Sequence, residues 1–388
     1  MPKKKATAKR ASKSPASPLL FADTSKSADQ LYVGGFGVPD AFISFKKGRK
    51  WFAVLNQLEF ARGLKESKFD EILSLEEWLE MSREKFQRAK VGYPEVIATL
   101  ASVFEISRFK VPAEFPSSLA FKLVELGFEL DVCDGTLFPN REVKSEEELE
   151  KIREGNRCSA IGIRAAEKAI RKSVVKKGKL YLDGKVLTSE RLRCLIEIAC
   201  LEAGAVSADT IAAGGDQACD PHCVGSGPLR SNELIIVDVF PRVSRTGYHG
   251  DMTRTFLKGK ASDAQKALVA GVFEAQQKAI KAVKTGVNGR DVHGQVLETF
   301  AKLGYETTRD ENGAKGFFHG TGHGLGLEVH EAPRVSIASN KLKRNAVVTI
   351  EPGLYYPGLG GCRIEDVVAV RDEGAELLSD LHYRWQLK

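Results

Sequence analysis

The sequence contains no long apolar run. Its apolar stretches span only a few residues, far below the ~18 that a membrane-spanning helix needs. The basic start of the chain leads into Ser and Pro instead of the apolar stretch of about 7–15 residues found in a secretory signal. A mitochondrial presequence is Arg-rich and helical, whereas this segment is Lys-rich and contains Pro15 and Pro18. We therefore expect a cytoplasmic protein that does not associate with membranes.

The sequence also lacks paired cysteines. Its seven cysteines are irregularly spaced and form no CxxC motif. Without a secretory signal, this pattern indicates reduced thiols rather than a disulfide framework. Cys219, His222 and Cys223 lie close in the sequence, but a structural zinc site needs four ligands, normally as two spaced pairs. We expect a loop with free thiols there.

Acidic residues are missing from residues 1–18, which hold six basic residues. Those six account for most of the chain's net charge of +7, so the remainder is close to neutral. The segment has no apolar periodicity, and we expect a disordered, solvated tail. The alternative is a weak electrostatic tether to nucleic acid, although the near-neutral body makes a nucleic-acid partner an unfavoured expectation.

What remains is an ordinary globular composition. The 388 residues are 43% hydrophobic and 28% charged, and at ~100–200 residues per domain they suggest two domains. In residues 19–143, predicted strands and helices alternate, which indicates an α/β domain. This part has a hairpin over 41–56, helices over 59–66, 75–90 and 94–105, and a capped helix followed by a strand within 115–135.

The second predicted domain covers residues 144–388. It opens with a long amphipathic helix over 144–174, where Ser145 and Glu148 have the spacing of a capping box. Hydrophobic periodicity then predicts helices over 188–203, 262–284 and 289–303, and strands near 208–213, 234–240, 248–256, 319–331, 346–351 and 363–370.

Four acidic residues lie at or near the ends of apolar strands in this second half. Asp238 follows an apolar run and Asp251 lies in the next predicted strand, with Pro241 and Gly247 between them. Those turn residues predict a hairpin that brings the two carboxylates together. Taken alone, either Asp also suits a turn or a helix cap. Carboxylates at the ends of two further apolar strands complete the set, namely Glu351 and Glu365.

Six of the seven histidines lie between residues 222 and 330. In the segment FFHGTGHGLGLEVHEAP, His319, Thr321 and His323 alternate, so in an extended chain they share one face. His330 is out of step and needs a bend or bulge to join them. The glycines do not form a phosphate loop, because no Lys-Ser/Thr follows them.

Four carboxylates and at least one histidine suit divalent Mn, Co, Fe or Zn. Four carboxylates also balance the charge of two such ions. Two metals ~3.5–4 Å apart can share a water and lower its pKa, which provides a nucleophile for amide hydrolysis. Other histidines would donate protons or polarise the carbonyl. The residues alone therefore predict a two-metal hydrolase.

Across residues 150–388 the ordered segments GDMTRTF, HGTGHGLGLEVHE, TIEPGLY and RIED resemble the pita-bread metallopeptidase family. This family includes Xaa-Pro aminopeptidases, prolidases and methionine aminopeptidases. The resemblance implies a pita-bread catalytic domain after a creatinase-like N-terminal α/β domain, an α/β (α+β) fold class overall. It implies that five residues bind two metal ions, with Asp251 and Glu365 bridging them: Asp238, Asp251, His323, Glu351 and Glu365.

The resemblance also implies roles around the metals. His319 and His330 would contact the substrate and stabilise the tetrahedral intermediate, while Glu351 would take part in returning a proton to the leaving proline nitrogen. His222 and Arg363 would line the substrate pocket. His249 shares strand parity with Asp251, but no family role attaches to it. Two departures are a longer loop between Asp238 and Asp251 and Cys223, which stands where a tyrosine is often found.

The implied activity is hydrolysis of the bond between an N-terminal residue and proline, as an Xaa-Pro dipeptidase or aminopeptidase. The N-terminal domain favours this over a methionine aminopeptidase-like specificity, and the full ligand set disfavours the metal-free creatinases. A non-enzymatic interaction protein on the same fold is the other alternative. Manganese is the expected metal, with cobalt, zinc or iron as alternatives, and a homodimer is the expected assembly.

Overall fold

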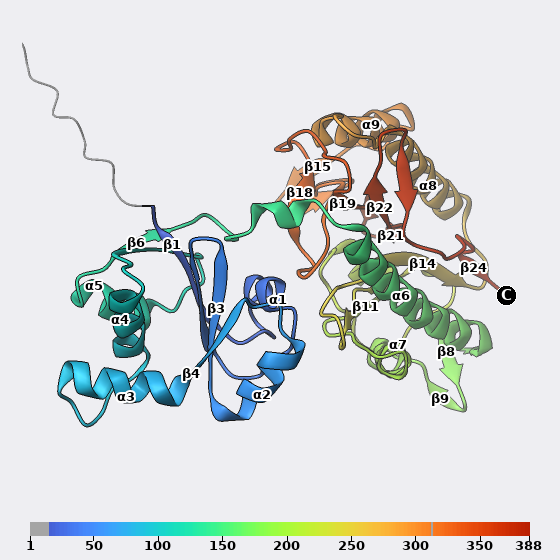
Figure 1. The fold of residues 1–388 in the computed structure, drawn as a ribbon. Helices are drawn as coiled ribbons and strands as arrows, with labels where there is room; N and C mark the ends of the chain where they lie inside the picture. The colour runs from blue at the N-terminus through green and yellow to red at the C-terminus, as the bar shows by residue number, and fades with distance from the viewer. Residues whose placement is uncertain (1–14, 312) are drawn as a thin grey trace, which may run out of the picture. The chain divides into compact units, whose positions relative to one another are not determined.

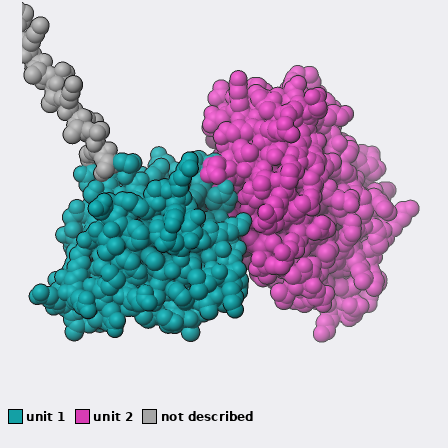
Figure 2. All heavy atoms as spheres, in the orientation of Figure 1, with its two compact units in different colours: residues 1–139 teal, residues 140–388 magenta. Residues whose placement is uncertain are grey.

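The structure is a computed structural model that describes residues 15–311 and 313–388. Most of the predicted basic tail therefore lies outside the described residues. The chain divides into two compact units, residues 1–139 and 140–388 (Figure 2). Our expected boundary after residue 143 falls a few residues later, just past a short 3-10 helix, Pro139–Glu142.

Unit 1 is an α/β domain built on a six-stranded sheet with the order β4-β3-β2-β1-β5-β6. β1 pairs antiparallel with β2 and β2 with β3, while the outer pairings are parallel. The strands are β1 Ser17–Ala22, β2 Phe42–Lys47, β3 Lys50–Leu55, β4 Glu71–Ser74, β5 Arg108–Val111 and β6 Glu129–Val132. The helices are α1 Ala28–Gly34, α2 Gln57–Glu66, α3 Leu75–Phe86, α4 Tyr93–Val103 and α5 Ser117–Glu125.

The α/β character expected for this part of the chain is confirmed. The predicted 41–56 hairpin is formed by β2 and β3, which face each other from Ile43–Val54 to Lys47–Lys50. One detail differs from the prediction. Ser17 and Pro18, which we assigned to the tail, belong to β1, where they pair with Phe109 and Lys110 of β5.

Unit 2 contains four long helices and two principal sheets (Figure 1). The four-stranded sheet has the order β11-β12-β14-β24 and the five-stranded sheet β18-β17-β19-β22-β23. The helices are α6 Glu146–Lys172, α7 Ser189–Glu202, α8 Asp263–Ala282 and α9 Gly289–Lys302, with a 3-10 helix η2 at Gly215–Cys219. The sheet strands are β11 Ile211–Gly214, β12 Ile235–Val239, β14 Met252–Lys258, β17 Gly322–Gly324, β18 Glu331–Val335, β19 Val347–Ile350, β22 Asp366–Val370, β23 Ala375–Leu377 and β24 Gln386–Leu387.

Shorter strands complete this unit. A three-stranded sheet follows α6, and three two-stranded ribbons join the longer elements. These strands are β7 Val174–Lys176, β8 Lys179–Leu182, β9 Lys185–Val186, β10 Ala205–Val206, β13 Arg242–Val243, β15 Thr308–Asp310, β16 Gly313–Lys315, β20 Gly353–Tyr356 and β21 Gly360–Arg363.

Each principal sheet is covered by its own pair of helices. Ile163 of α6 and Ile196 of α7 pack with Val237 and Phe256 of the four-stranded sheet. α8 and α9 bury a second apolar cluster against the five-stranded sheet. Burial of apolar surface at about 25 cal/mol per Å² makes these two layers the main source of this unit's stability. Among the described residues, no helix is long and apolar enough to cross a membrane.

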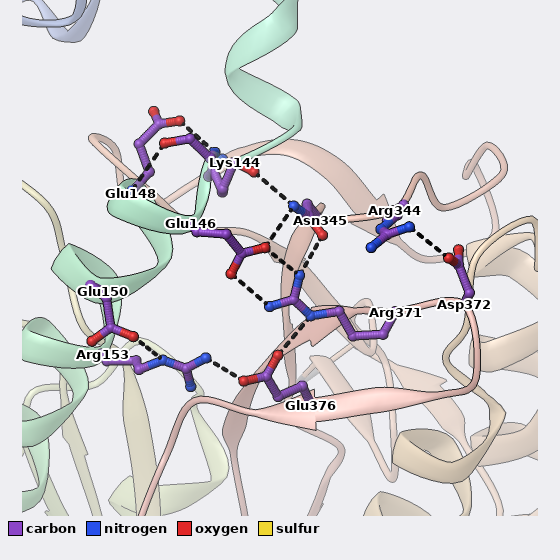
Figure 3. A network of polar contacts seen from close by, with 11 residues as sticks. Lys144, Glu146, Glu148, Glu150, Arg153, Arg344, Asn345, Arg371, Asp372 and Glu376 are labelled. Atoms are coloured by element: carbon purple, nitrogen blue, oxygen red, sulfur yellow. Dashed lines mark hydrogen bonds and ion pairs between the residues drawn. The ribbon is translucent and has the colours of Figure 1, made fainter.

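The start of α6 is tied to the five-stranded sheet by a network of charges (Figure 3). The predicted capping box forms, since Ser145 and Glu148 exchange hydrogen bonds through side chain and backbone. Arg371 donates to Glu146 at 2.8 Å and to Glu376 at 2.6 Å, and Arg153 also pairs with Glu376. These pairs are partly exposed, so each adds little stability alone.

The predicted strand over 319–331 is wrong. Within it only Gly322–Gly324 and Glu331, the first residue of β18, lie in strands, and the pairing of β17 with β18 shifts register between His323 and Gly324. A Cβ added at Gly322 would overlap the Thr349 carbonyl, and one added at Gly324 would overlap Ala332. The two glycines therefore allow close backbone packing and a sharp bend instead of one long strand.

Candidate metal centre

A cavity of about 760 Å³ in unit 2 gathers the residues that the sequence singled out. Its lining includes the five residues expected to bind metal, which are Asp238, Asp251, His323, Glu351 and Glu365. It also includes the four residues expected to contact the substrate or line its pocket, which are His222, His319, His330 and Arg363. They come from separate strands of both principal sheets and from the connecting loops.

Three of these side chains form a compact, buried group. Among residues 15–311 and 313–388, only Asp251, His323 and Glu365 offer ligand atoms that all lie within 4.8 Å of one another. His323 Nε2 lies 3.7 Å from Asp251 Oδ2 and 3.3 Å from Glu351 Oε1. Four of the five expected ligands thus converge on one point.

Asp238 lies beside this group, and its two carboxylate oxygens differ in their hydrogen bonding. Its Oδ2 accepts a hydrogen bond from Arg363 Nη2 at 2.9 Å. Its Oδ1 is buried and has no hydrogen-bond partner in the described part of the chain. A buried oxygen without a partner is costly, and coordination of a cation would satisfy it.

The electrostatics of the cluster also favour a bound cation. Burial raises the pKa of Asp251 well above its usual value, and the nearby carboxylates of Asp238 and Glu351 raise it further. Burial and the Asp251 carboxylate raise the pKa of Glu365 in the same way. Burial raises the pKa of Glu351 to about 7. Crowded carboxylates disfavour their own ionisation, and divalent ions would remove that penalty.

The protonation state of His323 also suits metal binding. Burial lowers the pKa of His323, so its imidazole is neutral near pH 7. Neutral imidazole is the metal-binding form, and together with carboxylate oxygens it suits first-row divalent metals. The residues present therefore fit divalent metal ions.

Asp251 is placed by close packing against α6. β12 and β14 pair antiparallel with Asp238 opposite Thr253, so the hairpin returns Asp251 to the end of its partner strand. A Cβ added at Gly250 would overlap the backbone of Gly155 in α6. The Asp251 backbone N–H donates to the Asn156 side chain at 3.2 Å. Asn156 was not identified from the sequence.

We expect Gly155→Ala to destabilise unit 2 by about 1–3 kcal/mol, because the added methyl group has no space against Gly250. It should also weaken metal binding, since Asp251 follows Gly250 directly. Urea unfolding and calorimetric metal titration measure both effects. The matched control is Gly294→Ala in α9, where an added Cβ meets nothing within 4 Å and helix propensity predicts a small gain. Equal stability of the two variants would contradict this interpretation of the Gly155–Gly250 contact.

Glu365 is held by the residues that follow Asp251. Thr253 Oγ1 donates to Glu365 Oε2 at 2.7 Å. Arg254 donates to the Glu365 carbonyl at 2.6 Å and to Asp366 Oδ1 at 2.8 Å. It also bonds the carbonyls of Leu381 and His382 and stacks on Tyr383. Glu365 lies between β21 and β22, not within the single strand that we predicted over 363–370.

A hydrogen-bonded relay runs from Arg363 to His319. Arg363 Nη1 donates to the Tyr355 hydroxyl at 3.1 Å, and that hydroxyl lies 2.9 Å from His319 Nε2. His319 Nδ1 lies 2.7 Å from the Gly320 carbonyl, which only accepts, so Nδ1 carries the proton. Burial and Arg363 lower the pKa of His319 to about 3. Tyr355 is a site residue that sequence reasoning missed, although it follows Glu351 by four positions.

The other histidines divide between the cavity and the surrounding structure. The rings of His330 and His323 lie 4.3 Å apart, through the bend that the sequence required. Thr321 does not share the cavity face with its neighbours. Its hydroxyl lies 2.8 Å from His293 Nδ1, away from the cavity lining. His249 does not line the cavity either.

The cysteines are the remaining residues that the sequence analysis considered as metal ligands. All seven cysteines are free, and neither Cys219 nor Cys223 joins the metal-binding group.

Arg334, four residues after His330, lines the cavity and was also missed by the sequence reasoning. A cation that follows a candidate catalytic histidine was the available signal, but exposed arginines are too common in sequences for that signal to be decisive.

The sequence model of metallopeptidase family M24 matches residues 150–372, more than half of the chain. The chain therefore belongs to this family, whose members are metallopeptidases. The family implies divalent metal ions, in agreement with the donor set described above.

Particular relatives agree with this assignment. The chain is 36% identical over 173 residues to the Xaa-Pro dipeptidase of Pyrococcus furiosus, covering 44% of this chain and 47% of that protein. It is 35% identical over 258 residues to an uncharacterized peptidase of Staphylococcus aureus, covering 64% of this chain and 65% of that protein. The matches thus span about half to two thirds of the length of these relatives.

Solved structures extend the likeness to both units. The X-Pro aminopeptidase of Thermotoga maritima superposes with a TM-score of 0.78 at 25% identity, covering 96% of this chain and 97% of that one. The Xaa-Pro dipeptidase of Bacillus anthracis gives 0.80 at 23% identity, covering 96% and 95%. The expected fold class, an N-terminal α/β domain followed by a pita-bread domain, is confirmed.

Proposed function

We propose that this protein is a metal-dependent exopeptidase that hydrolyses the bond between an N-terminal residue and proline. The observation that carries the proposal is the convergence of Asp251, His323, Glu365 and Glu351 in one cavity, with the unpartnered oxygen of Asp238 beside them. The likeness to Xaa-Pro peptidases supports the proline specificity, which the ligands alone cannot define.

In this proposal Asp238, Asp251, His323, Glu351 and Glu365 would hold two divalent ions, and manganese is the metal we expect. Such ions would supply a water of lowered pKa as the nucleophile for amide hydrolysis.

The protein's own groups supply the rest of the chemistry. His319 and His330 line the cavity, where His330 would stabilise charge that develops on the carbonyl oxygen. The two ring nitrogens of His319 are engaged by Gly320 and Tyr355, so His319 would contact the substrate through its ring. The Gly320 carbonyl fixes the tautomer of His319, and the Tyr355 hydroxyl, itself held by Arg363, restrains the orientation of the ring. Glu351 would take part in returning a proton to the leaving proline nitrogen, as the resemblance to the family implies. His222 would contact the substrate.

Arg334 provides a basis for preferring dipeptides. Arg363 is already engaged by Asp238 and Tyr355, whereas Arg334 lines the cavity without an ion pair in the described part of the chain. The proline carboxylate of a dipeptide would give Arg334 an anionic partner.

We expect Arg334→Met to lower kcat/KM for Ala-Pro by about 10- to 100-fold, the value of a charge-assisted hydrogen bond. Ala-Pro amide, which lacks the carboxylate, should change less than about 3-fold under the same principle. Steady-state kinetics of both substrates with both proteins measures this. Equal losses on the two substrates would remove Arg334 from carboxylate recognition.

A homodimer is part of the proposal, supported by the presence of the N-terminal unit that creatinase-like peptidases use for assembly. A cytoplasmic location is also proposed, since all seven thiols are free. Methionine aminopeptidase-like specificity and a non-enzymatic role are not favoured by the comparisons.

The test is hydrolysis of Ala-Pro, Ala-Pro-Ala and Met-Ala-Ser by EDTA-treated protein, with and without added manganese. Cleavage before proline that manganese restores is the expected result. The ratio of the first two rates then separates a dipeptidase from an aminopeptidase. Cleavage of Met-Ala-Ser alone would favour the methionine aminopeptidase alternative, and no cleavage by metal-loaded protein would overturn the proposal.

A further inference from the structure

Three charged side chains are buried together outside the metal-binding group. The side chains of Glu331, Arg141 and Lys144 are 7%, 6% and 1% exposed. Arg141 Nη2 donates to Glu331 Oε2 at 2.7 Å, and Lys144 Nζ donates to Glu331 Oε1 and to the Arg141 carbonyl. One carboxylate therefore meets two buried cations. Desolvation makes such a cluster expensive, so stability alone is a weak reason for it.

The cluster closes the turn that carries His330. The Glu331 carboxylate lies against Gly326, where an added Cβ would be 2.5 Å from Glu331 Oε1. Arg141 Nη2 also donates to Glu328 Oε2 at 2.8 Å, so one guanidinium holds carboxylates on both sides of His330. The other side of the turn is held by the Gly326 carbonyl, which accepts from the His249 N–H at 2.8 Å.

We propose that Glu331 is a positioning residue that, together with Arg141 and Lys144, holds the 326–331 turn so that His330 faces the cavity. This inference rests on the proposed function, in which His330 contacts the substrate. The carboxylate does not touch the reacting atoms. It restrains the backbone on either side of the imidazole, so its loss widens the range of positions that the His330 ring occupies.

The first experiment is a double-mutant cycle with Glu331→Gln and His330→Ala, using the best-cleaved peptide and metal-loaded protein. Glu331→Gln should lower kcat at least about 10-fold, with KM and metal content within about 2-fold, as expected for a group that acts on transition-state geometry. In the His330→Ala background the same change should lower kcat less than about 2-fold. Equal losses in both backgrounds would overturn the proposal.

Two further variants separate positioning from folding. Arg141→Lys retains the positive charge but not the planar fork that reaches Glu328 and Glu331, and it should repeat the non-additive pattern if Glu331→Gln does not fold. The matched control is Glu376→Gln, which removes a carboxylate held by Arg153 and Arg371 far from His330 in sequence (Figure 3). It should leave kcat unchanged. A comparable fall in kcat for Glu376→Gln would assign the effect to general destabilisation.

A readout that needs no turnover keeps this inference distinct from the proposed function. In zinc-loaded protein with labelled histidine rings, Glu331→Gln should shift or broaden the NMR signal assigned by the His330→Ala variant. The His382 signal should not move. If no peptide is cleaved but the His330 signal responds, the proposed function fails and the positioning role stands. An unchanged His330 signal would overturn the inference whatever the activity.

Discussion

Replacing Asp251 by Asn is expected to abolish tight metal binding and to lower kcat/KM by more than about 100-fold, the upper end of what loss of a residue behind a ligand costs. Asp251 is central to the compact group, 3% exposed, and close to both His323 and Glu365. Metal analysis after gel filtration and steady-state kinetics measure the two effects. Full turnover by Asp251→Asn protein would refute the two-metal proposal.

The same substitution should have the opposite effect on metal-free protein. Asp251, Glu365 and Glu351 crowd their carboxylates in a buried site, and removing one negative charge relieves repulsion. Metal-free Asp251→Asn protein should therefore melt at the same temperature as metal-free wild type or higher. The wild-type protein should gain stability when metal is added, while the variant should gain little. Asp372→Asn, which alters an exposed pair with Arg344, is the matched control and should bind metal normally (Figure 3).

Arg254→Met is expected to destabilise unit 2 by about 3–5 kcal/mol, because it leaves the buried Asp366 carboxylate without its cation. Both side chains are 3% exposed or less. The substitution also removes donors to the carbonyls of Glu365, Leu381 and His382. Denaturant unfolding at a fixed metal concentration gives the free energy, and a metal titration gives the expected loss of affinity.

Two comparisons make this result interpretable. Arg344→Met breaks an exposed pair with Asp372 and should cost no more than about 1 kcal/mol. Arg254→Met combined with Asp366→Asn should recover part of the loss, because the unpaired charge is gone while Gln276 and Tyr383 still bond to residue 366. If the double variant were as unstable as the sum of its parts, the buried charge would not be the cause.

The longer elements of the fold were predictable because each carries its own local signal. Amphipathic periodicity located α6 to α9 to within a few residues, and the Ser145–Glu148 spacing gave the start of α6. The strands of two or three residues, such as β7, β9 and β10, were missed. Their hydrogen bonds go to partners elsewhere in the chain, and runs that short have no measurable period.

The residues of the site likewise divide into those that the sequence pointed to and those that it did not. The four acidic residues became candidates because an acid at the end of an apolar strand is costly to bury without a partner. His319 and His323 became candidates because they alternate in a segment rich in histidine and glycine. Thr321 was wrongly grouped with them, since alternation in an extended chain was assumed where the chain bends. Asn156 was missed because nothing in its own neighbourhood distinguishes it from an ordinary helix residue. Arg334 and Tyr355 were missed because their only local signal, a place a few residues after His330 or Glu351, is too common to be decisive.

The sequence by itself determined the chemistry available to this protein: carboxylates and imidazoles of the right kinds, spaced at the ends of apolar strands, behind an α/β domain. Only the tertiary structure decided which of these groups meet. The contact between Thr253 and Glu365 joins residues 112 positions apart, and Arg363 engages one oxygen of Asp238 from 125 positions away while the other has no partner among the described residues. Such contacts follow from how whole sheets and helices pack, which depends on the entire buried surface and not on any local pattern.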